Sequence, residues 1–391
     1  MTSTEWRNLK LKDIAQLKKE SYKPTKAETI PYIGLEHIEQ QTLHLSGFGN
    51  SSDVISQKNK FSKGDILFGK LRPYFRKVYK AKFDGVSSTD ILIIEPKSSV
   101  DSDFLFYLIA NKAFIDLATN GSSGTKMPRA DWTHLSNSRW NIPDVKSQQK
   151  IGKILSALDE KIELNRQTNA TLEAIAQAIF KEWFVNFNYP GATGEMVESE
   201  LGMIPKGWKI LPMDKIADFL NGLALQKYPA ENEHDYLPVI KIREMKNGIT
   251  DSSDKASKNL PTKYVVHDGD LLFSWSGSLE IIFWVGGDGA LNQHLFKVTS
   301  NNYPIWFCYF WLLQYIDKFK EIAKDKTTTM GHIQRHHISE ALCLIPDKLD
   351  EIDEVMNPII EKIINNQKEV ILLAKIRDAL LPKLMSGEIE L

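Results

Sequence analysis

The sequence predicts a mixed α/β (α+β) protein with two tandem globular domains and two long helices. The helices are expected to pack as an antiparallel coiled coil, which gives the chain a pseudo-twofold internal repeat. Two patterns support this prediction: the second half repeats the first at an offset of about 202 residues, and each half contains a heptad pattern. The length of 391 residues, with 42% hydrophobic and 25% charged positions, suits two or three globular domains.

The repeat sets the expected domain boundaries. The segment GDILF at 64–68 returns as GDLLF at 269–273, and Ile-Pro at 142–143 returns at 345–346. The expected order is a first globular domain (1–146), a first helical region (147–187), a linker (188–204), a second globular domain (205–346) and a second helical region (347–391).

Each globular domain is expected to combine short strands with one clear helix. β-rich runs occur at 91–94 and 295–298, and helices are expected after Asp103 and Pro304, since aspartate and proline favour helix starts. A polar loop follows each helix, NGSSGTKMPRADW at 120–132 and KDKTTTMGHIQRHH at 324–337. Their matching places suggest a shared role in contacting a ligand, although both can also be ordinary surface loops.

The stretch GDILFGK at 64–70 superficially resembles a phosphate-binding loop. That motif needs Ser or Thr after the lysine to hold magnesium, but Leu71 stands there. The apolar residues at 66–68 favour a turn that leads into a buried strand. We therefore expect no ATP site here, and the second copy lacks the Gly-Lys pair altogether.

Positive charge is concentrated in the first domain. Residues 1–146 hold 22 Lys and Arg against 16 Asp and Glu, a net charge of +6, while the whole chain has −1. Nine cations lie within 58–82 and are interleaved with aromatic residues. This pattern is typical of surfaces that bind a polyanion, most often nucleic acid, although a solvated surface gives the same pattern.

The two helical regions share a heptad register. Apolar positions spaced by seven and four residues run from Ile151 to Trp183 and from Ile352 to Leu384. Asn165 and Asn366 occupy equivalent positions, where a polar residue penalises a wrong register. We expect the helices to pack against each other, with Pro382 ending the second. A helix of 35–40 residues would span roughly 50–60 Å.

The chain resembles the specificity subunits of type I restriction–modification enzymes over nearly its whole length. The resemblance is carried by IPDVKSQQKIGKILSALDEKIELN at 142–165, IPDKLDEIDEVMNPIIEKIINNQ at 345–367 and WFVNF at 183–187, together with the tandem organisation. The second helical stretch departs from the family pattern, because four of the five residues at 350–354 are acidic.

The resemblance implies two target-recognition domains, each reading half of a bipartite double-stranded DNA site, and helices that set the spacing and dock methyltransferase subunits. It implies no catalytic residue in this chain. Adenine methylation with S-adenosylmethionine, and DNA cleavage that needs ATP and Mg, would belong to the methyltransferase subunits, two per chain, and to restriction subunits bound through them. No signal peptide and no apolar run longer than nine residues occurs, so we expect a cytoplasmic protein with no membrane contact.

Two other functions remain open from the residues. Pro143-Asp144 followed by the Asp-Glu-Lys at 159–161 has the spacing of a PD-(D/E)xK nuclease, but these residues fall on the expected helix. The other is a coiled-coil adaptor whose domains bind proteins. His332 and His336 have the spacing of a helical metal pair without a third ligand, so no metal site is expected.

The expected DNA-binding residues are polar side chains in the turns after the GDILF-type strands and in the two polar loops. In the first domain they are Lys70, Arg72, Arg76, Lys77, Lys126 and Arg129. In the second domain they are Ser274, Ser276, Lys326, Gln334 and Arg335. Arg and Lys bind phosphates and guanine, while Gln binds adenine and Ser binds either base edges or phosphates.

Overall fold

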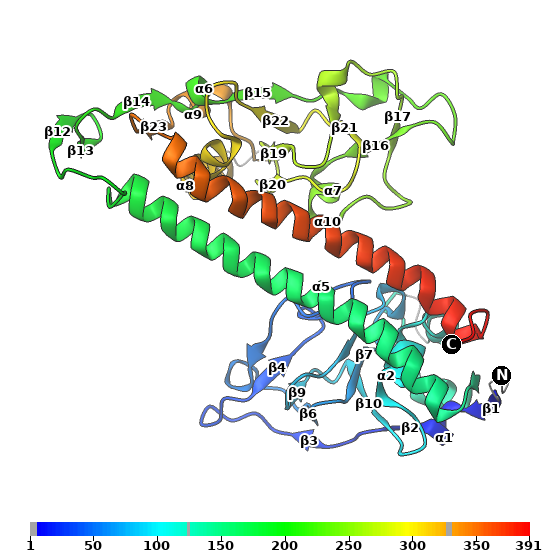
Figure 1. Cartoon of the computed structure of the whole chain (residues 1–391). Coiled ribbons are helices and arrows are strands. Elements are labelled where there is room, and N and C mark those ends of the chain that lie inside the picture. The colour runs from blue at the N-terminus through cyan, green and yellow to red at the C-terminus, as the bar shows by residue number, and fades with distance from the viewer. Residues whose placement is uncertain (1–5, 123–125, 326–330) are drawn as a thin grey trace. The chain divides into compact units, whose positions relative to one another are not determined.

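The computed structural model describes residues 6–122, 126–325 and 331–391. The chain forms two compact units, which we call unit 1 (Met1–Leu164 and Leu372–Leu391) and unit 2 (Asn165–Ile371). Two long helices, α5 (Val145–Phe180) and α10 (Asp350–Ser386), each contribute to both units (Figure 1). A π-helical turn, Lys181–Val185, extends α5.

Unit 1 contains a four-stranded antiparallel sheet, a five-stranded mixed sheet and one two-stranded pair. The strands are β1 (Arg7–Lys10), β2 (Ala15–Leu17), β3 (Ser21–Tyr22), β4 (Pro31–Ile33), β5 (Gly49–Asn50), β6 (Lys58–Phe61), β7 (Ile66–Gly69), β8 (Val78–Lys80), β9 (Gly85–Ser87), β10 (Ile91–Pro96) and β11 (Arg139–Ile142). The sheet orders are β2-β10-β7-β8, β3-β6-β9-β4-β5 and β1-β11.

Unit 2 contains the corresponding set of strands. They are β14 (Lys209–Pro212), β15 (Asp218–Asn221), β16 (Leu237–Ile240), β17 (Lys255–Ala256), β18 (Val265–Val266), β19 (Leu271–Ser274), β20 (Ile281–Phe283), β21 (Gly289–Leu291), β22 (Leu295–Thr299) and β23 (Leu342–Ile345). The sheet orders are β15-β22-β19-β20, β17-β16-β21-β18 and β14-β23. A separate hairpin, β12 (Met196–Ser199) with β13 (Gly202–Pro205), lies in the expected linker and continues into the second domain.

The sheets confirm the internal repeat strand by strand. Each four-stranded antiparallel sheet follows one order, with β2, β10, β7 and β8 matched by β15, β22, β19 and β20. Each mixed sheet holds one parallel pair, β4 with β9 and β16 with β21. The fold is therefore mixed α/β with two tandem copies, as the sequence predicts.

Short helices also recur between the strands. In unit 1 they are α1 (Leu11–Ile14), α2 (Ser102–Ala110), α3 (Lys112–Asn120) and α4 (Trp132–Asn137). In unit 2 they are α6 (Met213–Ile216), α7 (Ile242–Asn247), α8 (Ile305–Asp325) and α9 (Arg335–Ser339). The carboxylate of Asp101 accepts from the backbone N–H groups of Asp103 and Phe104, which fixes the start of α2.

The repeated Gly-Asp segment is a tight turn that feeds a buried strand. Gly64 and Gly269 have φ of 95° and 96°, a region that strongly favours glycine. The next residue closes the turn, because Asp65 accepts from the backbone N–H of Ser62 at 2.7 Å and Asp270 accepts from that of His267 at 2.7 Å. The glycines therefore serve a turn, as the sequence predicts.

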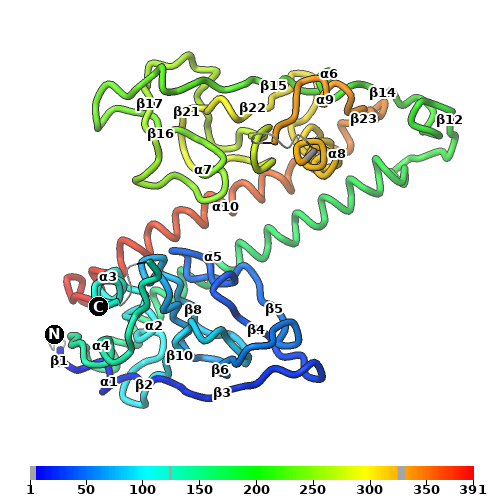
Figure 2. The backbone as a smooth tube through the Cα atoms, turned by 180° about the vertical axis from the view of Figure 1, so that it is seen from behind, coloured from blue at the N-terminus to red at the C-terminus, as the bar shows by residue number. Residues whose placement is uncertain are grey.

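Both long helices complete the hydrophobic core of each unit. In unit 1, Ile151 and Leu155 of α5 pack in one cluster with Leu381 and Leu384 of α10. In unit 2 the cluster instead takes residues from the end of α5 and the start of α10: Ala176, Phe180, Met356, Ile360 and Ile363. Within each unit the helix segments lie side by side, as the views from the front and from behind agree (Figure 1 and Figure 2).

The helix segments run antiparallel where their side chains meet. In unit 2, Asn165 Nδ2 donates to Glu369 at 2.7 Å and Asn169 Nδ2 donates to the carbonyl of Ile363 at 3.0 Å. The partner residue number rises as the α5 residue number falls, which defines the antiparallel direction. A regular coiled coil over the whole helix length stays a prediction.

The expectation that Pro382 ends the second helix is wrong. Helix α10 continues to Ser386, although proline removes one backbone hydrogen bond and clashes with the preceding turn. Leu381, Leu384 and Met385 of this last stretch are buried in the core of unit 1. Their burial offsets the cost of the proline. Among the described residues, no helix has the length and apolar character needed to cross a membrane.

Candidate nucleic-acid interface

In unit 1 the backbone joins the turn after β7 to the polar loop at 126–130. The N–H of Arg72 donates to the carbonyl of Pro128 at 2.8 Å, and the N–H of Ala130 donates to that of Lys70 at 2.9 Å. Leu71 and Arg129 form a β-bridge between these two contacts. We call the joined segments, 70–76 and 126–130, loop pair 1. It brings together cations that are more than 50 residues apart in the sequence.

Asp90 organises two of these cations. Its carboxylate lies 3.1 Å from Arg129 Nε and 3.8 Å from Lys70 Nζ. The backbone N–H of Lys70 also donates to the Asp90 carbonyl at 2.9 Å, so Asp90, the residue just before strand β10, holds loop pair 1 through both its side chain and its backbone. Arg129 keeps 45% of its side chain exposed. These cations are oriented by the protein and remain accessible to a polyanion.

Arg72 has an unusual backbone conformation at the tip of loop pair 1. Its φ of 52° is left-handed, a conformation that costs a non-glycine residue about 1–2 kcal/mol. It precedes the 3₁₀ turn η2 (Pro73–Phe75), which presents an exposed Tyr74. Within residues 6–122, 126–325 and 331–391, no group pairs with the Arg72 guanidinium. Arg72 is therefore available to contact a ligand, and Lys126 in the facing segment is exposed too.

Arg76 and Lys77 are directed into the protein, which argues against their predicted role in binding DNA. Arg76 Nε donates to the carbonyl of Ala110 at 2.8 Å, and its Nη2 lies 3.2 Å from Asp378. Lys77 Nζ donates to the carbonyl of Leu35. Burial lowers the pKa of both side chains. The sequence shows that a cation is present, but not which way it points.

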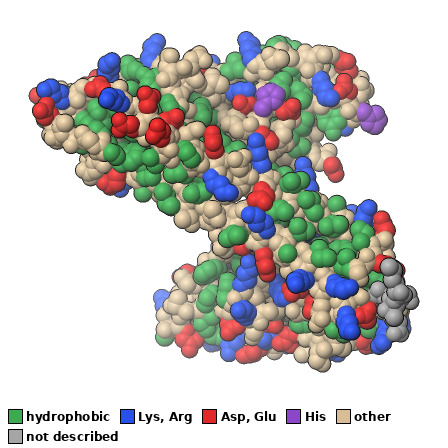
Figure 3. Space-filling model, viewed as in Figure 1, with side chains coloured by type: hydrophobic (Ala, Val, Ile, Leu, Met, Phe, Trp, Pro, Cys, Tyr) green, Lys and Arg blue, Asp and Glu red, His purple; other side chains and the backbone are tan. Residues whose placement is uncertain are grey.

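Several cations of the basic stretch at 58–82 have partners within the protein. Lys58 is buried against Ser56, Lys60 pairs with Glu20, and Lys80 pairs with Asp103. On the face drawn in Figure 3, Lys and Arg side chains alternate with Asp and Glu and form no single basic patch. The candidate interface is therefore a small set of oriented side chains.

Unit 2 has a matching loop pair at the corresponding place. The N–H of Gly277 donates to the carbonyl of Gly331 at 2.8 Å, and the N–H of Ile333 donates to that of Trp275 at 3.0 Å. Ser276 and His332 form the β-bridge between them. We call these segments, 275–277 and 331–335, loop pair 2. The same backbone connection therefore carries a different set of side chains in the second unit.

His294 takes the place of Asp90 in loop pair 2. The backbone N–H of Trp275 donates to the carbonyl of His294, matching the contact of Lys70 with Asp90. His294 Nδ1 lies 3.0 Å from Ser276 Oγ, and the Trp275 ring packs against the rings of His294 and His332. Trp275 Nε1 donates to Asn221 Oδ1 at 2.9 Å. Loop pair 2 is therefore built around aromatic rings and contains Arg335 as its single Lys or Arg residue, whereas loop pair 1 contains five such cations.

The predicted DNA-binding residues of unit 2 lie in different environments. Ser274 is fully buried, and its Oγ contacts the carbonyl of Ser278 and the N–H of Glu280, so a direct DNA contact is excluded in this conformation. Ser276 is 4% exposed. Gln334 is exposed at the start of α9. Arg335 is exposed but donates to the carbonyl of Phe219 and covers the Phe296 ring. Lys326 lies outside the described residues.

The sequence predictions missed Asp90, Trp275 and His294 as parts of the loop pairs. One signal was present: Asp90 and His294 follow the same offset as the strands β10 and β22 that they precede. A search for charged or aromatic residues at matching positions of the repeat would have found both.

The residues of the nuclease alternative have structural roles. Asp144 caps α5 by accepting from the backbone N–H groups of Lys146 and Ser147, and its hydrogen bonds with Ser147 lower its pKa. Asp159 accepts from the Tyr107 hydroxyl at 2.6 Å and pairs with Arg377. Within the described residues, no group of three or more His, Cys, Asp or Glu could hold a metal ion.

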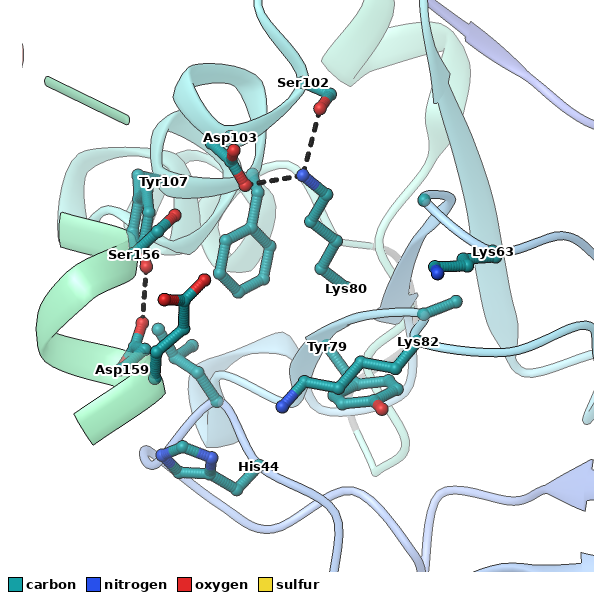
Figure 4. A pocket seen from close by; sticks show the side chains of 15 residues that line it. His44, Lys63, Tyr79, Lys80, Lys82, Ser102, Asp103, Tyr107, Ser156 and Asp159 are labelled. Carbon is teal, nitrogen blue, oxygen red and sulfur yellow. Dashed lines mark hydrogen bonds and ion pairs between the residues drawn. The ribbon is translucent and has the colours of Figure 1, made fainter. Parts of the chain in front are cut away.

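A cavity of about 590 Å³ lies elsewhere in unit 1, between α5, α2 and strand β8 (Figure 4). Tyr107 and Asp159 form one wall, with their hydrogen bond drawn in the figure, and Lys80 meets Ser102 and Asp103 on another. Its lining contains no residue of loop pair 1. The cavity and the candidate interface are thus separate features of unit 1.

The repeated scaffold with two matched loop pairs defines a class of protein that presents two different recognition surfaces. A family model described as type I restriction modification DNA specificity domain matches residues 3–174 and 205–374. The chain therefore belongs to this family and carries its domain twice.

Characterised relatives and a solved structure agree with this assignment. The chain is 29% identical to the type I restriction enzyme MjaIX specificity subunit of Methanocaldococcus jannaschii, covering 98% of this chain and 94% of that protein. It is 26% identical to the HindI specificity subunit of Haemophilus influenzae, covering 99% and 100%. The crystal structure of a type I restriction-modification system S subunit from M. genitalium has the same fold, with a TM-score of 0.60 at 15% identity over 98% and 97% of the two chains.

Proposed function

We propose that this chain is the DNA-sequence-specificity subunit of a type I restriction–modification enzyme and reads a bipartite site, one half with each unit. One observation carries the proposal: two backbone-joined loop pairs occupy the same place in two copies of one fold and carry different side chains. Different side chains on equal frames suit the recognition of two different base sequences.

The chemistry of loop pair 1 suits a site that contains guanine or closely spaced phosphates. The guanidinium of Arg72 or Arg129 can donate two hydrogen bonds to O6 and N7 of guanine in the major groove. Lys70 and Lys126 can bind phosphates, which positions the protein on the duplex.

Loop pair 2 suits a different half-site. The amide of Gln334 can pair with N6 and N7 of adenine, and Trp275 offers an apolar surface to a thymine methyl group. His332 and Arg335 lie in the same segment as Gln334, where they can approach phosphates. The two halves of the DNA site are therefore expected to differ in sequence.

The proposed role is non-catalytic. Methyltransferase subunits, two per chain in keeping with the repeat, would bind this chain and supply adenine methylation with S-adenosylmethionine. Restriction subunits would join through them and use Mg and ATP for cleavage. The names of the curated relatives support this assignment of partners. Because its proposed ligand is cellular DNA, we place the protein in the cytoplasm.

The proposal is tested by changing one loop pair and measuring each half-site. Comparing methylated adenines in genomic DNA with and without this protein first gives the site. The full chain, assembled with its methyltransferase subunits, is then titrated against duplexes altered in either half. Arg72→Ala should cost about 1–3 kcal/mol of discrimination at the first half-site, whereas Gln334→Ala should do so at the second.

Lys112→Ala is the matched control, because Lys112 is an exposed cation of unit 1 that pairs with Asp116 on the same helix. It should leave the discrimination at both half-sites unchanged. Equal losses at both half-sites with Arg72→Ala would contradict the assignment of one half to each unit. A chain that binds no DNA but retains a protein partner would instead support the adaptor function.

A further inference from the structure

Unit 1 contains a cluster of charged side chains, centred on a buried arginine, that links both long helices to loop pair 1. Its outer member, Asp378, keeps 41% of its side chain exposed. Arg377 of α10 is 1% exposed. Its Nη1 lies 2.6 Å from the Asp159 carboxylate of α5, and its Nε lies 3.1 Å from Asp378. Nη1 also donates to the carbonyl of Thr42 at 3.1 Å. We call Arg377, Asp378, Asp159, Tyr107 and Arg76 the Arg377 cluster.

Arg76 connects this cluster to the recognition loop. Both of its Nη atoms reach Asp378, at 3.2 and 3.3 Å, and its Nε donates to the carbonyl of Ala110 at the end of α2. Arg76 has a left-handed φ of 49°, and Arg72 at the other end of the η2 turn has a φ of 52°. The shape of the Arg72–Arg76 turn is thus set at its inner end by three directional hydrogen bonds.

The corresponding positions in unit 2 carry no charged side chain. Strand pairing and helix alignment match Arg76 with Leu279, Tyr107 with Phe310, Asp159 with Ile360 and Arg377 with Ala176. All four of these unit 2 residues are buried in one hydrophobic cluster. The same fold is therefore stable without the charges, in keeping with the general finding that apolar residues can replace buried ion pairs.

Since the fold of unit 2 forms without these charges, the Arg377 cluster is expected to have a role that is particular to unit 1. Apolar contacts are non-directional, whereas the hydrogen bonds of a guanidinium fix both its position and its orientation. Loop pair 1 presents long, flexible cations, and Arg72 among them lacks any partner in the described part of the chain. Such a loop gains most from an anchor that holds its backbone in one conformation.

We propose that Asp378 and Arg377 of α10 are positioning residues for DNA recognition, which hold the Arg72 turn in its reading conformation through Arg76. This inference rests on the proposed function of loop pair 1. If it holds, helix α10 helps to determine which first half-site is recognised, although Asp378 itself need not contact DNA.

The test replaces the Arg377 cluster by its unit 2 counterparts, which are apolar except for Gln177, the match of Asp378. We call the result the apolar variant. The variant carries Arg76→Leu, Tyr107→Phe, Asp159→Ile, Arg377→Ala and Asp378→Gln. A second variant, Asp378→Asn, removes one charge at nearly constant shape, and Asp378→Glu is the conservative control. Each full chain, assembled with its methyltransferase subunits, is titrated against duplexes altered in the first or the second half-site, and thermal unfolding is recorded.

We expect the apolar variant and Asp378→Asn to lose about tenfold in discrimination at the first half-site, a typical coupling between distant sites. Discrimination at the second half-site should stay within about twofold, and Asp378→Glu should recover most of the loss. Since the apolar set already packs in unit 2, we expect the apolar variant to fold. If it does not, Asp378→Asn alone decides the question.

Two results would overturn the inference. Wild-type discrimination at the first half-site in the folded apolar variant and in Asp378→Asn, while Arg72→Ala loses it, would show that the loop reads DNA without this anchor. Equal losses at both half-sites would show a general structural role. If Arg72→Ala itself has no effect on the first half-site, the assignment of loop pair 1 fails, and the positioning role fails with it.

Discussion

The side-chain amide of Asn366 on α10 donates to Asn169 Oδ1 on α5 at 2.8 Å, and both residues are buried. Asn169 in turn donates to the carbonyl of Ile363, and Asn165 pairs with Glu369. The heptad pattern matched Asn165 with Asn366 as equivalent positions of the repeat. Because the helices run antiparallel, each asparagine meets a residue other than its repeat equivalent.

The buried asparagine pair predicts a clear asymmetry between single and double substitutions. Asn366→Ala removes the donor to Asn169 and should lower the free energy of unfolding by about 1–3 kcal/mol, the cost of a buried polar group without its partner. Replacing both residues by leucine should be nearly neutral, since no buried polar group is then left over. Urea unfolding of the wild type and the two variants measures this, and a double variant less stable than the single one would refute the explanation.

The two Gly-Asp turns predict equal and independent effects. Gly64→Ala and Gly269→Ala should each cost about 1–2 kcal/mol, because both positions have left-handed φ values with open space around them. The double variant should show the sum within about 0.5 kcal/mol, because the sites lie in different units. Urea unfolding tests this. Asparagine at the same positions serves as the control and should cost less, since it tolerates this conformation better.

Glu173 predicts a pH-dependent stability of unit 2. This residue of α5 lines a pocket with Phe283, Tyr309 and Ile363, and burial raises its pKa. The folded state then binds the proton of Glu173 more tightly than the unfolded chain does. The contribution of Glu173 to the free energy of unfolding is therefore most favourable at acid pH and is lost as the pH rises through the folded pKa. Glu173→Gln should therefore raise the melting temperature at neutral pH and have little effect at acid pH.

Melting curves recorded across pH measure this difference. Glu200→Gln removes an exposed carboxylate of the same unit and should give no such pH dependence. A constant gain in melting temperature across the whole pH range would mean that ionisation of Glu173 has no part in the effect.

The burial of the two cysteines predicts that the folded protein does not react with thiol reagents. Cys308 and Cys343 are buried, and burial raises the pKa of the Cys308 thiol to about 12 and that of Cys343 as well. Since the thiolate is the reactive form, iodoacetamide at mildly alkaline pH should label neither residue until the protein unfolds. Mass spectrometry of labelled peptides with and without urea checks this. Fast labelling of Cys308 in the folded protein would show that unit 2 opens locally.

Much of the fold could be predicted from the sequence because it depends on local patterns and on the repeat. The Gly-Asp turns, the apolar strands that follow them and the two long helices each have a short-range signature. The end of α10 could not be predicted this way. Pro382 is a local stop signal, and only the core of unit 1 shows that the next turn of helix has a place to pack.

The sequence indicated both loops of each candidate site but not the direction of their side chains, and their role in binding DNA stays a prediction. Loop composition indicated Arg72, Arg129 and Lys126. It could not separate them from Arg76, because the partner that turns Arg76 inward, Asp378, lies 302 positions away in the sequence. Ser274 failed for a similar reason, since its burial depends on how β19 meets β20. The spacing between the half-sites, which the long helices are expected to set, stays a prediction.

The joined loops have a consequence for how such a protein can change over time. Their links are made by amide and carbonyl groups, which every residue except proline supplies, so no particular side chain is needed to keep the segments together. Under the proposed function, mutations at Arg72, Arg129 or Trp275 would alter which DNA sequence is recognised while the fold persists. A cell lineage could acquire new DNA targets by a few point changes, without rebuilding the molecule that displays them.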